Sequence, residues 1–302
     1  MKVSIVICTW NRSDLLRGCL ERLVALRIPV GVEHEIVVVD NNSTDATKKT
    51  VEEFARLAPV VYVFEGEQGI AYARNKALSV VTGDYIFWTD DDVRVPSDWV
   101  TKYVEAIEAL GDPDLLGSGV SPYLGDSSPL WLINGWEFVE AAYAMRKPPS
   151  MNYEPIKVGY LPFGANMVMR RKALKDIGFD TRLGRKGALM LSGEERKIIL
   201  ALLVRTNAVA RWVPDNTVTH IIPVERQTLR YIHAYYAGHG LQVRLEEDTL
   251  DSERVETPRW VYRRWFESLL LFGLKFLFKR DCSWLDDFRI WSQYHGRLFG
   301  QR

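Results

Sequence analysis

The segment YIFWTDDD, residues 85–92, decides the fold. Its first four residues are apolar, as in a buried strand of an α/β sheet, and three carboxylates follow after Thr89. Adjacent carboxylates repel one another unless a cation neutralises them, so this strand end predicts a ligand site, with a solvated acidic turn as the alternative. Because successive residues of an extended chain point to opposite sides, we expect Asp90 and Asp92 on one side and Asp91 on the other.

The segments before this strand alternate between strand and helix patterns. Apolar runs predict buried strands at 3–8, 35–39 and 60–64. Helical patterns follow them at 15–24, 47–57 and 69–81. Repeated strand–helix units favour an α/β fold with a Rossmann-like, mainly parallel sheet flanked by helices.

Polar residues follow three of the predicted strands. They are Thr9 and Asn11, then Asp40 and Asn41, then the aspartates at 90–92. Ligands of open parallel sheets bind beyond the carboxyl ends of the strands, so we expect these side chains to converge on one crevice. Asp and Asn also form turns, but three such clusters favour a site.

The second half of the chain shows a different pattern. Helices are predicted at 99–110, 172–177, 194–204, 227–245 and 260–278, and strands at 163–170 and 209–213. Residues 111–162 contain many Pro and Gly and are expected to be irregular. Because no clean linker is visible, we predict one domain, 1–225, followed by a helical C-terminal extension, 226–302.

Composition excludes several classes of protein. Lys plus Arg and Asp plus Glu both number 39, so the formal net charge is zero and we expect no nucleic-acid partner. The three cysteines form no CxxC pair, which favours a reducing compartment without structural zinc. We expect no signal peptide, because Lys2 is followed by only residues 3–9 before Asn11 and Arg12. We expect no membrane-spanning helix, because no apolar run reaches about 18 residues, and the expected location is cytoplasmic.

Four ordered motifs resemble the signature of the family 2 glycosyltransferases. They are IVICTWNR at 5–12, VVVDNNSTD at 37–45, GIAYARN at 69–75 and TDDD at 89–92, followed by GAN at 164–166 and SGEE at 192–195. One departure is Cys8, where the family usually has Pro. The resemblance implies a GT-A fold, a nucleotide-sugar half at about 1–110, an acceptor half at about 111–225, a Mg²⁺ or Mn²⁺ cofactor and an inverting mechanism.

The resemblance also assigns roles by position. It implies nucleotide-sugar contacts for Thr9, Asn11, Asp40, Asn41, Arg74, Asp90, Asp91 and Arg230. The Asp-x-Asp pattern makes Asp92 the metal ligand, with help from Asp90 and His220. Asp40 suggests a UDP-sugar. Arg230 belongs to QTLRY at 227–231, which resembles the QxxRW motif of processive synthases with Tyr in place of Trp.

Glu194 and Glu195 open a predicted helix, where acidic residues are favoured by the helix dipole. The resemblance gives them a second role, because the pair matches the Glu-Asp motif of the family, whose second member is the general base. By position that member is Glu195, with Glu in place of Asp. A carboxylate here would take a proton from the acceptor hydroxyl, and inversion needs no covalent intermediate.

These features together predict a hexosyltransferase-like enzyme. It would move a sugar from a nucleotide diphosphate-sugar to a saccharide or lipid-linked acceptor in cell-surface polysaccharide or glycoconjugate synthesis. One alternative is a nucleotidyltransferase that makes nucleotide-sugars, which would require a Gly-rich phosphate loop after the first strand, and CTWN at 8–11 is not one. Another alternative is a non-catalytic nucleotide-sugar-binding partner.

The tail has a composition of its own. Residues 259–280 interleave basic side chains with Trp, Phe and Leu. This composition suits a helix lying on an anionic membrane surface, peripheral on the inner face, and it equally suits a helix packed on the catalytic domain or on a second subunit.

Overall fold

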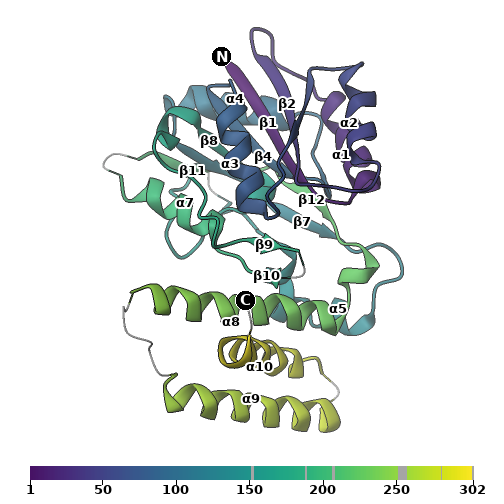
Figure 1. Ribbon diagram of the computed structural model, residues 1–302, viewed down its shortest axis with the longest axis vertical. Helices are drawn as coiled ribbons and strands as arrows, with labels where there is room; N and C mark the ends of the chain where they lie inside the picture. The colour runs from purple at the N-terminus through teal and green to yellow at the C-terminus, as the bar shows by residue number, and fades with distance from the viewer. Residues whose placement is uncertain (151–152, 188, 206–207, 251–256, 280, 301–302) are drawn as a thin grey trace. The chain divides into compact units, whose positions relative to one another are not determined.

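The computed structural model describes residues 1–150, 153–187, 189–205, 208–250, 257–279 and 281–300. The chain forms two compact units (Figure 1). The first comprises Met1–Tyr123, Ala144–Arg182 and Glu194–Ile221, and the second comprises Leu124–Tyr143, Leu183–Gly193 and Ile222–Arg302. The predicted functional division at residue 225 stays a prediction.

A seven-stranded sheet forms the centre of the first unit, in the order β11-β6-β8-β4-β1-β2-β3. Its strands are β1 (Lys2–Thr9), β2 (Glu33–Asp40), β3 (Val60–Phe64), β4 (Tyr85–Asp90), β6 (Leu115–Gly117), β8 (Met167–Arg170) and β11 (Ala210–Trp212). Neighbouring strands are parallel except where β8 runs antiparallel to β4 and β6. The predicted α/β fold with a mainly parallel sheet is therefore confirmed.

Helices cover both faces of this sheet. They are α1 (Ser13–Val24), α2 (Thr47–Ala55), α3 (Ile70–Val80), α4 (Trp99–Leu110) and α7 (Glu194–Leu203). Because side chains alternate along a strand, Ile5 and Ile7 of β1 join one core with residues of α1, α2 and α4. Val6 joins a second core, with residues of α3 and α7.

The expectation that residues 111–162 are irregular is wrong in part. This stretch contains β6, β7 (Val120–Tyr123), α5 (Leu130–Asn134), α6 (Trp136–Val139) and a 3₁₀ turn at Glu140–Tyr143. Strands of three or four residues are too short to show a period. Gly117 in β6 and Pro122 in β7 are residues typical of turns, so the sequence indicates a loop there. The predicted strand at 163–170 begins as a 3₁₀ turn, Gly164–Asn166, and the predicted helix at 172–177 is a 3₁₀ turn at Arg171–Leu174.

The described residues also form two smaller sheets. In the first unit, β12 (Val218–Ile221) lies between β5 (Val93–Arg94) and β7. In the second unit, β9 (Arg185–Lys186) pairs with β10 (Leu189–Met190). The short β5 directly follows the three aspartates, so its pairing with β12 brings a distant segment to the end of β4.

Three long helices dominate the second unit (Figure 1). They are α8 (Leu229–Leu250), α9 (Arg259–Phe278) and α10 (Trp284–Phe299), preceded by a 3₁₀ turn at Val224–Arg226. Helix α10 packs against both α8 and α9. The α8–α10 crossing is close, since a Cβ on Gly240 would meet the Gln293 carbonyl oxygen at 1.8 Å. In the described ranges no helix is long and apolar enough to cross a membrane.

Candidate active site

The polar ends of three strands lie at one edge of the large sheet. Strand register pairs Cys8 with Asp90 and Thr9 with Asp40, so the ends of β4, β1 and β2 are adjacent. Buried parallel strands bring these positions together although they are up to 82 residues apart in sequence. The predicted polar residues therefore lie at the carboxyl ends of the strands, where α/β sheets bind their ligands.

A single arginine bridges two of the three aspartates. The Arg12 Nη1 lies 2.8 Å from Asp91 Oδ1 and 3.0 Å from Asp92 Oδ2. Thr9 donates its hydroxyl to the other oxygen of Asp91 at 2.7 Å. Burial raises the pKa of Asp91, and the guanidinium and the hydroxyl oppose that rise. Arg12 thus supplies the neutralising charge that adjacent buried carboxylates require.

The expectation that Asp91 points away from Asp92 is wrong. Strand β4 ends at Asp90, and Asp91 and Asp92 already belong to a turn. The two-residue alternation applies only within the extended strand, so both carboxylates can reach the same guanidinium.

His220 reaches Asp92 through the small sheet. Strand β12 pairs His220 with Val93, and the amide of Ile221 donates to the Asp92 carbonyl at 2.8 Å. The His220 Nε2 lies 3.3 Å from Asp92 Oδ1, and both side chains are buried. The structure thus brings together two of the three predicted metal ligands in direct contact.

Asp90, the third predicted ligand, is buried beside these groups. Burial and repulsion from Asp92 raise its pKa to about 6, against the attraction of Arg74 and His220. Within the described residues, no group of three or more His, Cys, Asp or Glu side chains is placed to hold a metal ion. The Asp92–His220 pair nevertheless offers a carboxylate oxygen, a donor that suits Mg²⁺ and Mn²⁺, beside an imidazole nitrogen.

A second charged cluster lies around Arg74, which is only 4% exposed on α3. Its Nη1 donates to Glu194 Oε1 at 2.8 Å, and its Nη2 donates to Glu195 Oε1. Burial lowers the pKa of Arg74, but the two carboxylates outweigh that effect and raise it. The residue predicted to contact the nucleotide therefore pairs with the predicted general base and its neighbour.

Gly164 completes this cluster. Its amide donates to Glu195 Oε2 at 2.9 Å, so both oxygens of that carboxylate are held. A Cβ at this position would lie 2.3 Å from Glu195 Oε1 and 2.7 Å from Arg74 Nη2. A larger residue here would force the Arg74–Glu195 ion pair to shift. Sequence reasoning missed this role, although GAN at 164–166 was visible as a motif.

The same motif contains a fully buried asparagine that sequence reasoning also missed. Asn166 Oδ1 accepts from the indole of Trp99 and the hydroxyl of Tyr103, both at 2.9 Å. Its Nδ2 donates to the carbonyls of Gly119 and Asn216 at 2.7 and 2.8 Å. Asn166 satisfies four polar groups and so ties α4 to the segments beside the site.

Asp40 has partners of its own at the crevice edge. It accepts the Ser43 amide at 2.9 Å and the Tyr62 hydroxyl at 2.8 Å. Burial and the Asp40 charge raise the pKa of Tyr62, so the phenol remains a donor. Asp40 is thus held in a fixed orientation at the end of β2.

The two predicted asparagines hold loops. Asn11, at a φ of 51°, accepts the Thr44 amide at 2.7 Å. Asn41 accepts the Gly69 amide at 2.7 Å and donates to the Glu67 carbonyl at 2.6 Å. Arg230 lies in the first turn of α8, in the second unit.

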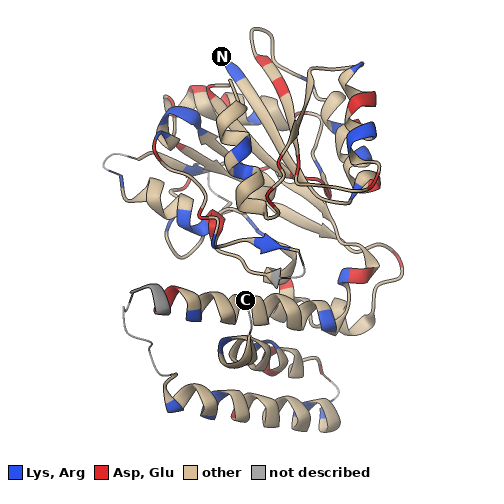
Figure 2. Ribbon diagram, in the orientation of Figure 1, with Lys and Arg blue, Asp and Glu red and all other residues tan. Residues whose placement is uncertain are grey.

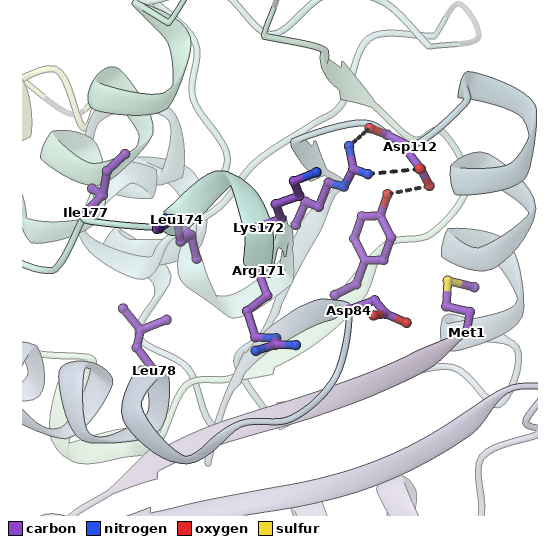
Figure 3. A pocket seen from close by; sticks show the side chains of 11 residues that line it. Met1, Leu78, Asp84, Asp112, Arg171, Lys172, Leu174 and Ile177 are labelled. Carbon is purple, nitrogen blue, oxygen red and sulfur yellow. Dashed lines mark hydrogen bonds and ion pairs between the residues drawn. The ribbon is translucent and has the colours of Figure 1, made fainter.

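A cavity of about 790 Å³ opens at the opposite edge of the large sheet (Figure 3). Met1 and Asp84, which precede β1 and β4, line it together with basic residues around Arg171. Asp112, labelled in Figure 3, forms an ion pair with Arg170, whose Nη2 lies 2.9 Å from Asp112 Oδ2. None of the predicted site residues lines this cavity.

Comparison with known proteins identifies the family. The model of glycosyl transferase family 2 matches residues 4–178. The succinoglycan biosynthesis protein ExoM of Rhizobium meliloti is 27% identical over 236 residues, which cover 77% of this chain and 71% of that protein. The glucosyl-dolichyl phosphate glucuronosyltransferase of Haloferax volcanii is 26% identical over 252 residues, 80% of this chain and 77% of the relative.

A solved structure shows the same fold. The mannosyltransferase PcManGT of Pyrobaculum calidifontis, in complex with GDP-Man and Mn²⁺, superposes with a TM-score of 0.59 at 19% identity. The match covers 99% of this chain and 88% of that one. Since the family model spans more than half of the sequence and the fold agrees, the chain belongs to glycosyl transferase family 2.

Proposed function

We propose that this family 2 glycosyltransferase is a metal-dependent, inverting enzyme. It moves a hexose-like sugar from a nucleotide diphosphate-sugar, with UDP as the expected nucleotide, to a saccharide or lipid-linked acceptor in cell-surface polysaccharide or glycoconjugate synthesis. The observation that carries the proposal is the pairing of Glu195 with Arg74 and Gly164 in the unit that also holds the Asp92–His220 pair. The names of the two relatives, one in succinoglycan biosynthesis and one acting on a dolichyl phosphate sugar, support the acceptor class.

The donor would bind at the edge formed by β1, β2 and β4. The proposed contacts are Thr9, Asn11, Asp40, Asn41, Arg74, Asp90, Asp91 and Arg230. Asp40 would accept from the base N–H, since a carboxylate held by Tyr62 stays oriented for such a bond. Asn11 and Asn41 would act by fixing the loops that surround the nucleotide.

Asp92 and His220 would hold the divalent ion, Mg²⁺ or Mn²⁺, with Asp90 beside them. Two protein ligands are sufficient, because the diphosphate and water supply the others. When bound, the ion would neutralise the charge of the departing nucleoside diphosphate.

Glu195 would act as the general base. The acceptor oxygen attacks the anomeric carbon as the bond to the diphosphate oxygen breaks, and the hydroxyl proton passes to Glu195. Arg74 and Gly164 would fix the direction of this carboxylate, and each of its oxygens keeps a second lone pair for the proton. Glu194 would position Arg74 from the other side.

The location and the domain roles belong to the same proposal. We place the enzyme in the cytoplasm, peripheral on the inner face of the membrane, with no nucleic-acid partner. The nucleotide-sugar half would comprise about 1–110, the acceptor half about 111–225 and the helical extension 226–302.

A thermal-shift screen over UDP-, GDP- and dTDP-sugars, with and without Mn²⁺, tests the proposal. Ligands that bind only the folded protein raise its midpoint of unfolding by mass action. We expect the largest increase with a UDP-sugar and Mn²⁺ together. If none of these nucleotide-sugars raises the midpoint under any metal condition, the proposed donor class is wrong.

A further inference from the structure

Among the residues that the structure describes, helix α9 is covered on one side, by α10. Its buried residues, Val261 and Ser268, lie on the same side as Phe272. The Phe272 ring packs on Phe288 of α10, with ring centroids 5.1 Å apart. On this side, too, Lys275 pairs with Asp287 of α10 at 2.6 Å. These contacts fix the rotation of α9 about its own axis.

The opposite side carries an uncovered apolar stripe. Phe266, Leu270, Leu274 and Leu277 follow one another at intervals of four, four and three residues, so they form one row. They are 46% to 73% exposed, and the next residue, Phe278, is 79% exposed. Single exposed apolar side chains are ordinary, whereas a contiguous row marks a surface that contacts something apolar. We call this row the α9 stripe.

Basic residues flank the α9 stripe (Figure 2). The first turns carry Arg259, Arg263 and Arg264, all exposed, and Lys279 follows the last turn. Glu267 is the one acidic residue of the helix. Between 268 and 278 the sole charged residue is Lys275, which faces α10. The stripe is therefore uncharged over its second half and has a basic residue at either end.

We propose that α9 docks on the surface of an anionic lipid bilayer. The helix would lie parallel to the surface, with the α9 stripe in the acyl boundary and Arg263, Arg264 and Lys279 at the lipid phosphates. This combination of basic and apolar sides is that of interfacial helices. Tyr262, which is 51% exposed, adds an aromatic ring of the kind enriched at the headgroup level.

The charges also argue against a second copy of the chain as the occupant. In a symmetric pair of α9 helices, each copy offers the same surface. Because both ends of the helix are basic, parallel and antiparallel pairings alike would oppose like charges. An anionic bilayer, in contrast, attracts the basic residues at both ends of α9. The proposal concerns the second unit alone and does not depend on the transfer reaction.

Vesicle binding of the full chain tests the proposal. We expect the protein to co-sediment with vesicles of phosphatidylglycerol and phosphatidylcholine, and much less with phosphatidylcholine alone. The double variant Leu274→Glu/Leu277→Glu should lose most of the association. The matched control is Leu57→Glu, a similar change at a residue 77% exposed in the first unit, and it should bind as the wild type does.

The basic residues are tested by Arg263→Gln/Arg264→Gln. Each arginine near an anionic surface is worth a factor of about five in affinity at moderate salt. The pair should therefore weaken binding to anionic vesicles on the order of 25-fold and leave binding to neutral vesicles unchanged. If Leu274→Glu/Leu277→Glu does not fold, Leu277→Gln replaces it, with a weakening of several-fold expected.

Three results would overturn the proposal. The first is a wild-type protein that shows no preference for anionic vesicles. The second is a folded stripe variant with wild-type affinity for them. The third is a wild-type dimer in solution that the stripe variant converts to a monomer without any change in vesicle binding, which would assign the stripe to a second copy. UDP-induced stabilisation of the same variants reports separately on the donor site.

Discussion

Charged side chains usually lie at the protein surface and apolar ones in the core, and two regions of this protein depart from that rule. The end of β4 buries charges, and helix α9 exposes apolar side chains. At the end of β4, the carboxylates of Asp91 and Asp92 are 3% and 4% exposed. Along α9, Leu277 and Phe278 are more than 70% exposed. Burying a charge and exposing an apolar row both cost free energy, so each arrangement requires a compensating contact. Asp91 and Asp92 have such contacts within the protein, with Arg12 and His220. The row on α9 does not pack on α10, so its contact is expected with another molecule.

The largest effect is expected where the buried charges meet the proposed metal. Asp92→Asn keeps the shape of the side chain and removes its charge, so transfer should fall about 10²–10³-fold, as for loss of a charge-stabilising group. Circular dichroism should show an unchanged fold. Turnover measured with and without EDTA checks the prediction, and a variant that is fully active in EDTA would exclude the metal role of Asp92.

Arg74→Gln tests how much the buried ion pair contributes to stability. It leaves Glu194 and Glu195 with uncompensated charge, and breaking a buried pair in this way costs about 3–5 kcal/mol. Chemical denaturation measures the difference in the free energy of unfolding. The matched control is Arg17→Gln, which breaks the Arg17–Glu53 pair on the protein surface and should leave the unfolding midpoint nearly unchanged. Equal losses in the free energy of unfolding of the two variants would mean that the buried Arg74 ion pair stabilises the protein no more than the surface pair does.

Gly164→Ala tests how closely Gly164 approaches Glu195 and Arg74 in the same cluster. The added Cβ would contact Glu195 and Arg74, so the ion pair must shift, at a cost of about 1–3 kcal/mol. Gly18→Ala is the control, because outside the backbone of its own helix no atom lies within 4 Å of a Cβ there. Denaturation of both variants decides whether the close approach is real. A Gly164→Ala protein as stable as the wild type would contradict it.

The smallest effect is expected on α9. Leu277→Glu replaces a side chain that is 73% exposed, and surface changes of this kind stay within about 0.5 kcal/mol in stability. Thermal unfolding of the variant without lipid provides the measurement. A loss of several kcal/mol would show that Leu277 packs inside the protein, and the contrast between the two regions would disappear.

Much of the fold could be predicted, because long apolar runs and helical periods are local signals. The runs at 3–8, 35–39 and 85–88 correspond to β1, β2 and β4. Of the shorter strands, β8 and β11 correspond to the predictions at 163–170 and 209–213, whereas β6 and β7 were missed, because three or four residues show no clear period. Helix α10 was missed for another reason, since its buried side includes Asp287, Ser292 and Gly296 as well as apolar residues.

The site was predictable as a set of residues but not as a set of contacts. Motifs indicated Arg74 and Glu195 separately, and 121 positions separate them in the chain. Their pairing depends on how α3 and α7 pack on the same face of the sheet, which no local pattern encodes. Arg12 lay inside a quoted motif, yet its bridge between Asp91 and Asp92 follows from the turn after β4.

The central claim, that Glu195 is the base of a transfer reaction, is tested most directly by comparing Glu195→Gln with Glu194→Gln. Donor affinity and transfer rate are measured for both. The account predicts that Glu195→Gln binds UDP-sugar normally and transfers roughly 10²–10⁴-fold more slowly, while Glu194→Gln loses much less. Near-normal transfer by Glu195→Gln together with an inactive Glu194→Gln would mean that Glu194, and not Glu195, is the base. Near-normal transfer by both variants would mean that the base is another residue.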